Sequence, residues 1–231
     1  MQYYATYVLG IKDVEIHPLT HVGRLVHKAF EDTLKWNKGS LLPVDPLQFL
    51  PALLEQYKVQ EFERVAREFV AKAVEWGYLK NLDVMVGCEC KFDFQIESGI
   101  KVTGIIDRLD FHPDSNATVM DLKTGKSTCD EKELAQDWQA RIYNIAARTL
   151  IPEIKTCTLT FWYLRKQRVT VLKTREDAAF DKLKLQNIAN QIRDTEPKCN
   201  PSALCRWCSY NECPSFAAGK LKMRLKKLWK K

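Results

Sequence analysis

The sequence predicts an α/β protein in which a β-sheet is flanked by helices. Two observations predict this class. Apolar residues recur with the period of a helix between His21 and Trp36, whereas between Glu89 and Ile96 they alternate with charged and polar residues, as in a half-buried strand. The chain has 231 residues, which is long enough for one large hydrophobic core with a small appendage.

The remaining elements follow in order along the chain. Two helices are predicted at 21–36 and 52–76, separated by the proline-bearing loop LLPVDPLQFLP. A three-strand meander follows at 89–96, 100–111 and 118–122, and then a helix at 130–150, a strand pair at 156–164 and 168–173, and a helix at 176–194. Helices before, between and after the strands are typical of the α/β or α+β class.

The composition is that of an ordinary globular protein, with 45% apolar and 28% charged residues. No segment approaches the roughly 20 apolar residues that a membrane-spanning helix needs. The N-terminus, MQYYATYVLGIKD, lacks the basic and apolar regions of a signal peptide. We therefore expect a cytoplasmic protein with no membrane partner.

The net charge of +7 is concentrated at the C-terminus. Residues 220–231 (KLKMRLKKLWKK) include seven basic residues and no acidic one, which leaves 29 basic and 29 acidic residues in the rest of the chain. A basic tail favours an anionic partner, either nucleic acid or a membrane surface. Leucines and a tryptophan on one side of the tail would also suit a membrane-surface helix, so both alternatives stay open.

The segment VMDLKTGKST (119–128) combines two patterns that predict different chemistry. Its second half, TGKST, is similar to the end of a phosphate-binding loop, which needs the spacing G-x-x-x-x-G-K-[ST] so that backbone N–H groups can surround the phosphates. The first glycine of that spacing would fall at Met120, and Asp121 would lie where the phosphates belong. The phosphate loop is therefore excluded.

The first half, MDLK, predicts a metal site. On a strand, Asp121 and Lys123 project from the same face about 7 Å apart, and the preceding strand supplies Asp107 in GIID. Two carboxylates with waters and a substrate phosphate satisfy Mg²⁺, and Lys123 would hold the attacking water or offset charge in the transition state. Arg108 is expected to add local positive charge. The alternative is that Asp107 pairs with Arg108 or another cation, and that Asp121 and Lys123 form a solvated strand end.

Four motifs, in order along the chain, carry a resemblance to a known family. GRLVH (23–27), GIID (104–107), MDLK (120–123) and QARIY (139–143) resemble the motifs of the RecB-type branch of the PD-(D/E)XK nucleases. The resemblance implies a restriction-endonuclease-like mixed sheet flanked by helices. It also implies a metal site made by His27, Asp107, Asp121 and the backbone carbonyl of Leu122, with Lys123 catalytic and with Gln139 and Tyr143, one helical turn apart, positioning the lysine or the DNA.

The function that this resemblance implies is that of a Mg²⁺- or Mn²⁺-dependent deoxyribonuclease. We expect an exonuclease that acts on single-stranded or end-bearing DNA in repair, recombination or phage DNA metabolism, with a helicase or recombination protein as a partner. The alternative is a non-catalytic DNA-binding or scaffold subunit of the same fold that carries an iron–sulfur cluster or zinc. Intact acidic residues and lysine in the motifs favour the enzyme.

Four cysteines cluster near the C-terminus, in CNPSALCRWCSYNECP (199–214): Cys199, Cys205, Cys208 and Cys213. The pair spaced C-x2-C can bring two thiolates to one metal or cluster, and the spacing does not choose between zinc and iron–sulfur. The family resemblance favours a [4Fe–4S] cluster, because several relatives hold one with a similar run of three cysteines. Cys199 would replace a fourth ligand that those relatives supply from upstream of the histidine helix.

These features together predict three segments. A nuclease domain spans 1–195, with N-terminal helices at 21–77 and a catalytic core at 82–195. A cysteine-rich, cluster-binding segment follows at 196–216, and a basic tail at 217–231.

Overall fold

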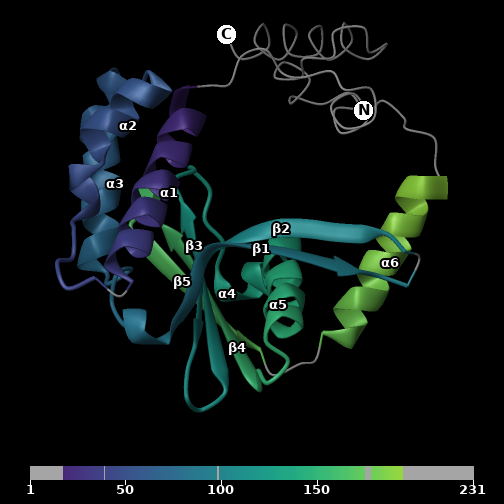
Figure 1. Ribbon diagram of the computed structural model, residues 1–231. Coiled ribbons are helices and arrows are strands. Elements are labelled where there is room, and N and C mark those ends of the chain that lie inside the picture. The colour runs from purple at the N-terminus through teal and green to yellow at the C-terminus, as the bar shows by residue number, and fades with distance from the viewer. Residues whose placement is uncertain (1–17, 39, 98, 175–177, 195–231) are drawn as a thin grey trace, which may run out of the picture. The chain divides into compact units, whose positions relative to one another are not determined.

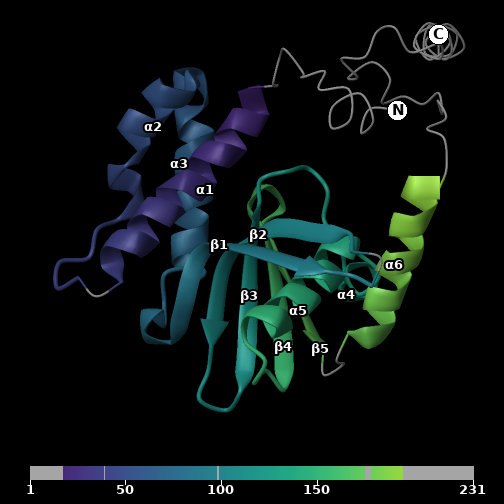
Figure 2. The same cartoon turned by 45° about the vertical axis from the view of Figure 1, so that its right-hand side comes forward.

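The computed structural model describes residues 18–38, 40–97, 99–174 and 178–194. One compact unit, Pro18–Asn187, contains all the strands of these described residues. Its elements are shown in Figure 1, and Figure 2 gives a second view. Within this described part, no helix is both long enough and apolar enough to cross a membrane.

Five strands form one mixed sheet in the order β1-β2-β3-β4-β5. The strands are β1 (Met85–Gln95), β2 (Lys101–Phe111), β3 (Asn116–Lys123), β4 (Thr156–Tyr163) and β5 (Arg168–Thr174). β3 and β4 pair in parallel, and the other neighbours are antiparallel. A parallel pair needs a crossover, which helix α5 (Trp138–Leu150) provides. The sheet and its flanking helices confirm the predicted fold class.

The prediction of one continuous helix at 130–150 is wrong, because the helix is interrupted. The chain instead forms a short α4 (Glu131–Leu134) and then α5. Asp137 separates them, because its side chain accepts hydrogen bonds from the backbone N–H groups of Gln139 and Ala140 and so begins a new helix.

The single helix predicted at 52–76 is also divided. After α1 (Pro18–Asn37), the chain forms α2 (Leu50–Tyr57) and α3 (Glu63–Glu75). Lys58 ends α2 in the left-handed conformation, with φ at 54°. The next residue, Val59, is 1% exposed, so its burial accounts for the turn in the chain.

The two faces of the sheet bury different partners. Helices α1, α2 and α3 cover one face, where their apolar side chains form a core with Leu122 and Trp162 from the sheet (Figure 1). Helix α5 packs against β1, β3 and β4. The last described helix, α6 (Ala179–Asp194), is tied to α5 by an ion pair between Asp181 and Arg141. Alternate residues of one strand therefore face either the helices α1, α2 and α3 or the helix α5.

Candidate active site

The candidate active site lies where β2 and β3 stop pairing. Their antiparallel ladder runs from Phe111–Ala117 to Arg108–Met120 and ends there, although both strands continue. We call this point the fork. Asp107 is the first residue of β2 beyond the ladder, and its Oδ2 accepts a hydrogen bond of 2.8 Å from the backbone N–H of Leu122. The carboxylate therefore satisfies a backbone donor that has no partner on β2.

Helix α1 brings His27 to the fork. His27 Nδ1 lies 3.3 Å from Asp107 Oδ2. A Cβ on Gly23, one turn earlier, would lie 2.8 Å from Thr124 Oγ1, so glycine allows α1 to approach the loop after β3. Burial lowers the pKa of His27, but its hydrogen bond to Asp107 and the nearby carboxylates outweigh burial and raise the pKa to about 9.

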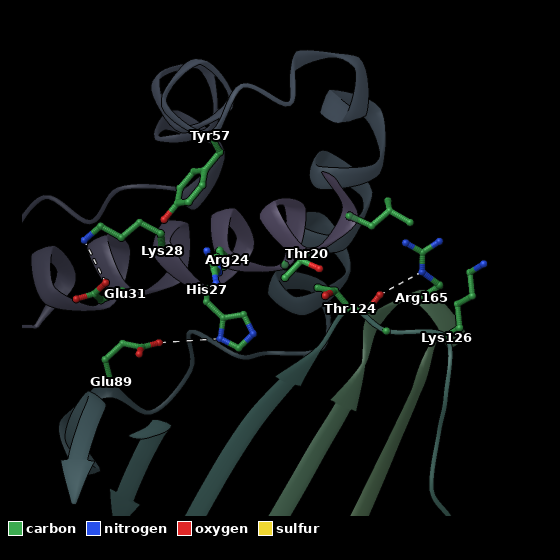
Figure 3. A pocket seen from close by; sticks show the side chains of 13 residues that line it. Thr20, Arg24, His27, Lys28, Glu31, Tyr57, Glu89, Thr124, Lys126 and Arg165 are labelled. Carbon is green, nitrogen blue, oxygen red and sulfur yellow. Dashed lines mark hydrogen bonds and ion pairs between the residues drawn. The ribbon is translucent and has the colours of Figure 1, made fainter. Parts of the chain in front are cut away.

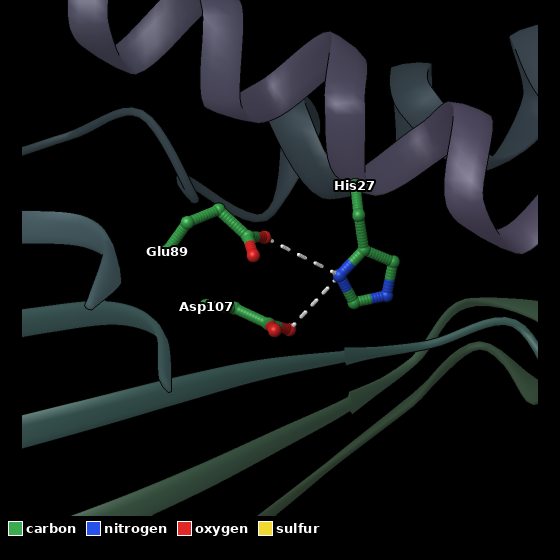
Figure 4. A group of neighbouring side chains, drawn as sticks. All are labelled: His27, Glu89 and Asp107. Carbon is green, nitrogen blue, oxygen red and sulfur yellow. Dashed lines mark ion pairs between the residues drawn. The ribbon is translucent and has the colours of Figure 1, made fainter. Parts of the chain in front are cut away.

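Glu89 of β1 completes a group that the sequence analysis missed. Its Oε1 lies 4.0 Å from His27 Nδ1, and one potential ligand atom from each of His27, Glu89 and Asp107 lies within 4.8 Å of the other two. Figure 4 shows both carboxylates pointing toward the imidazole ring. Burial and the charge of Asp107 raise the pKa of Glu89. A metal ion could be bound by this group.

The pairing of β1 with β2 could have revealed Glu89. The ladder pairs Cys88 with Arg108 and Cys90 with Ile106, so Glu89 falls opposite Asp107. The backbone of Glu89 has φ at 47°, in the left-handed region that a glutamate rarely adopts, and such outliers cluster at functional sites.

Asp121 of β3 lies on the other side of the fork and is almost fully buried, with 2% of its side chain exposed. Its Oδ1 receives hydrogen bonds from Gln139 and Tyr143. Its Oδ2 accepts no hydrogen bond, although Lys123 Nζ lies 2.7 Å away as an ion pair. Burial and the charge of Asp107 raise the pKa of Asp121 to about 6, against the opposing effect of Lys123.

Helix α5 holds Asp121 and Lys123 in place through two side chains four residues apart. Gln139 Nε2 donates to Asp121 Oδ1 over 2.9 Å and to the Tyr143 hydroxyl over 2.8 Å, while Gln139 Oε1 accepts from Lys123 Nζ over 2.7 Å. The Tyr143 hydroxyl lies 2.9 Å from Asp121 Oδ1 and 3.1 Å from the carbonyl of Ile105, and its one proton serves one of them at a time. Gln139 therefore joins the carboxylate, the ammonium and the phenol.

The residues of the fork suit a hard divalent cation. They offer carboxylate oxygens and one imidazole nitrogen, which Mg²⁺ and Mn²⁺ accept. Asp121 Oδ2 is buried and has only the ion pair with Lys123 among the described residues, so one of its lone pairs is available to a metal ion. Ligation of a metal by His27, Asp107, Asp121 and the backbone carbonyl of Leu122 stays a prediction.

Arg108 does not add positive charge to the site, and this expectation was wrong. The guanidinium is fully buried, pairs with Asp110 at 2.8 Å, and donates to the carbonyls of Tyr78, Lys80 and Asn81. The alternative pairing of Asp107 with Arg108 is also wrong, because Asp107 contacts His27 and Leu122. Arg108 instead holds the chain between α3 and β1.

The four cysteines of the predicted cluster, Cys199, Cys205, Cys208 and Cys213, lie outside the described residues, as does the basic tail. The cluster and the tail therefore stay predictions. The same holds for the segment boundaries at 195–196 and 216–217.

Comparison with known proteins identifies the family of this chain. Residues 1–213 match the PD-(D/E)XK nuclease superfamily. The ATP-dependent helicase/deoxyribonuclease subunits B of Streptococcus agalactiae serotypes Ia, V and III are each 26% identical to this chain over 142 residues. The match covers 56% of this chain and 13% of those relatives, so the chain spans a small part of their length.

A solved structure shows the same fold. The crystal structure of a candidate exonuclease from Eubacterium rectale has a TM-score of 0.57 and 14% identity, covering 90% of this chain and 80% of that chain. The family match spans most of the sequence and includes His27, Asp107, Asp121 and Lys123. The chain belongs to the PD-(D/E)XK nuclease superfamily, as the four motifs predicted.

Proposed function

We propose that this protein is a metal-dependent deoxyribonuclease that acts as an exonuclease on single-stranded or end-bearing DNA. One observation carries the proposal. Asp121 presents a buried oxygen at the fork whose one partner among the described residues is Lys123 Nζ, 2.7 Å away, next to the group of His27, Glu89 and Asp107. A cation site beside an ammonium group is what hydrolysis of a phosphodiester requires.

The metal site of this proposal uses His27, Asp107, Asp121 and the carbonyl of Leu122, and Glu89 extends it. Bound Mg²⁺ or Mn²⁺ would stabilise charge on the phosphoryl oxygens and lower the pKa of a bound water. Asp107 Oδ2 is fixed by the Leu122 N–H, so its carboxylate faces the site without rearrangement.

Lys123 is the proposed catalytic residue. An ammonium has three N–H donors. One points to Gln139 Oε1, and Asp121 Oδ2 lies close to the same nitrogen. The Lys123 side chain is 31% exposed, so a further donor can reach a water or a phosphoryl oxygen. The group would orient the attacking water or offset charge in the transition state.

Gln139 and Tyr143 are positioning residues in this mechanism. They contact Asp121 and Lys123 rather than the space where substrate would bind. Burial raises the pKa of Tyr143, so the hydroxyl remains a neutral donor at physiological pH. Together they keep one oxygen of Asp121 occupied and leave the other available for the metal.

The test is digestion of DNA by the purified full chain. End-labelled linear and circular single-stranded DNA, and linear duplex, are incubated with Mg²⁺, Mn²⁺ or EDTA. We expect cleavage of linear DNA with metal, no cleavage in EDTA, and no cleavage of circles. Asp121→Asn and Lys123→Ala should lose activity, whereas Asp93→Asn, an exposed residue paired with Lys101, should retain it. Full activity of Asp121→Asn would overturn the proposal.

A [4Fe–4S] cluster bound by the C-terminal cysteines belongs to this proposal, with zinc as the alternative. Protein purified without oxygen should then contain iron and sulfide in equal amounts, and Cys208→Ala should lose both. One zinc ion with no iron would exclude the cluster. Retention of the cluster in Cys199→Ala would show that its fourth ligand lies elsewhere.

A helicase partner is also part of the proposal. The matched relatives are named as subunits of an ATP-dependent helicase/deoxyribonuclease, and the phosphate-loop spacing fails in this chain. The competing function is a non-catalytic DNA-binding or scaffold subunit. That alternative predicts that the protein binds DNA but does not cleave it, whichever metal ion is added. The digestion experiment measures this directly.

A further inference from the structure

A pocket of about 680 Å³ lies between α1 and the loop that follows β3, and two residues of the candidate metal-binding group, His27 and Glu89, line it. Arg24 and His27 line it from α1, Glu89 lines it from β1, and Thr124, Gly125 and Lys126 line it from the loop after β3. Figure 3 labels all of these except Gly125. Thr124, Gly125 and Lys126 belong to the TGKST segment, which the sequence analysis excluded as a phosphate loop and to which the nuclease mechanism gives no role.

The pocket contains two cations that are free to bind a ligand. Arg24 and Lys126 are exposed, and neither makes a hydrogen bond or an ion pair with the described residues. The other cations of the pocket are engaged. Lys28 bonds to Glu31 and Asp32, and Arg165 donates to the carbonyl of Thr124 over 3.1 Å. Among the described residues, the positive charge of this pocket that no acidic group pairs with therefore lies at Arg24 and Lys126.

Gly125 leaves the pocket open. A Cβ built on this residue would meet no atom within 4 Å, and its φ lies outside the left-handed region. Glycine is therefore not required here by the protein's own packing or backbone. A Cβ at this position would extend into open space.

We propose that this pocket binds the DNA backbone next to the scissile phosphate, with Arg24 and Lys126 each neutralising one phosphate of a single strand. This inference rests on the proposed nuclease function and adds to it the path of the substrate. The acidic fork attracts a phosphate only through a metal, so the neighbouring phosphates need cations of their own. Lys126 lies three positions after Lys123, a span of at most about 11 Å. That distance reaches the next few phosphates of a strand at about 3.4 Å or more per nucleotide.

The first test measures the salt dependence of binding. A fluorescent oligo(dT) is titrated with the full chain carrying Asp121→Asn, which prevents cleavage, at several NaCl concentrations. Adding Arg24→Gln and Lys126→Gln should reduce the slope of log affinity against log salt by about 1.4, or 0.7 for each lost contact on a single strand. The matched control, Arg64→Gln with Lys132→Gln, removes one arginine and one lysine that are exposed and line none of the described pockets.

A second variant changes the shape of the pocket without changing its charge. Gly125→Val should fold normally, because its Cβ meets no protein atom, and should weaken oligo(dT) binding at least about tenfold by occupying the space for the backbone. Unchanged binding in Gly125→Val together with an unchanged salt slope in the double variant would overturn the inference.

A third measurement locates the contacts relative to the cut. Single neutral methylphosphonate linkages are placed at each of the first three positions on either side of the scissile phosphate. Cleavage by the wild-type chain should fall at one or two positions, and Arg24→Gln/Lys126→Gln should lose that sensitivity. Equal sensitivity in the two proteins would contradict the inference.

The outcomes separate this inference from the proposed function. If the chain cleaves no DNA but the salt slope falls in Arg24→Gln/Lys126→Gln, the pocket is supported as a strand-binding site and the nuclease proposal is overturned. If the chain cleaves DNA but the salt slope is unaltered in that variant, the nuclease proposal is supported and the role of the pocket in binding DNA is overturned. Absence of oligo(dT) binding by the full chain overturns the inference outright.

Discussion

The backbone N–H of Leu122 donates to Asp107 Oδ2 over 2.8 Å at the point where β2 and β3 stop pairing. In a continuous sheet this N–H would bond to a carbonyl of the neighbouring strand. Here a side chain takes that place, so the same interaction closes the end of the ladder and orients the carboxylate. The fork therefore couples the local stability of the sheet to the geometry of the candidate metal site.

Substitutions of Asp107 should separate these two roles. Asp107→Asn keeps an oxygen that can accept from Leu122 but removes the charge, so cleavage should fall at least about a thousandfold with little change in stability. Asp107→Ala removes the acceptor as well and leaves a partly buried N–H unpaired, which should cost a further 1–3 kcal/mol or so of unfolding free energy. Urea denaturation and cleavage rates measure the two effects. Equal stability of the two variants would contradict the dual role.

Tyr143→Phe tests the positioning of Asp121. The phenylalanine keeps the packing of a side chain that is 5% exposed but removes the hydroxyl that bonds to Asp121 Oδ1. We expect a fall in kcat of about tenfold to a hundredfold, with DNA affinity unchanged, because the carboxylate loses a partner that fixes its orientation.

A purely structural role for Tyr143 would give a different result. Stability would fall while kcat per folded molecule stayed constant. The concentration of Mg²⁺ needed for half-maximal activity provides a second measurement, and it should rise in Tyr143→Phe if Asp121 binds the metal. Tyr163→Phe, at a buried tyrosine of β4, is the control.

The metal-free site should become less stable as pH rises. His27 has its pKa raised to about 9, so its contribution is fully present below about pH 6.5 and is lost as pH rises through 9. Folding raises the pKa of Asp121 to about 6. The folded protein therefore also loses stability relative to the unfolded chain as pH rises from about 3.8 through 6. The Tm of the protein in EDTA should therefore fall between pH 4 and pH 9.

Mg²⁺ should reverse this trend. Metal binding requires a neutral imidazole and a charged carboxylate, so it displaces protons and strengthens with pH. The rise in Tm on adding Mg²⁺ should be larger at pH 9 than at pH 6, and at pH 7 binding should release about one proton, measured by calorimetry in buffers of different ionisation enthalpy. His27→Gln should abolish that release. A metal-induced rise in Tm that is independent of pH would contradict ligation at the fork.

The sequence predicted those parts of the fold and site that depend on local pattern. The alternation of apolar and polar residues located all five strands. The motif order pointed to Asp107, Asp121 and Lys123, whose roles stay predictions. The break at Lys58 depends on the burial of Val59, which no local period reveals. The cap at Asp137, an aspartate placed just before a helical run, was readable but was missed.

The errors at the site have a different physical origin. Glu89 is brought to His27 by the register of the β1–β2 hairpin, so it was found only after the strands were paired. Arg108 lies next to Asp107 in sequence, but successive residues of a strand point to opposite faces. Its guanidinium consequently pairs with backbone carbonyls near α3 instead of entering the site.

The contact between Gly23 and Thr124 should control the position of His27. Gly23→Ala would place a Cβ 2.8 Å from Thr124 Oγ1, inside the closest approach that a Cβ normally makes. The Thr124 side chain, the helix or the loop must shift, and His27 lies one turn along the same face of α1. Cleavage should fall about tenfold or more, because small displacements of a metal ligand are costly, while the gain in helix propensity of about 1 kcal/mol offsets part of the packing cost.

Removing the opposing atom should rescue this variant. Thr124→Ala deletes Oγ1 and keeps the backbone carbonyl that accepts from Arg165 over 3.1 Å. In that background Gly23→Ala should retain the cleavage rate of Thr124→Ala alone and should raise the free energy of unfolding through helix propensity. The double-mutant cycle thus measures a coupling between the two residues in both activity and stability. Additive effects would show that the close approach of α1 to the loop does not position His27, and that the loss in Gly23→Ala arises within the helix.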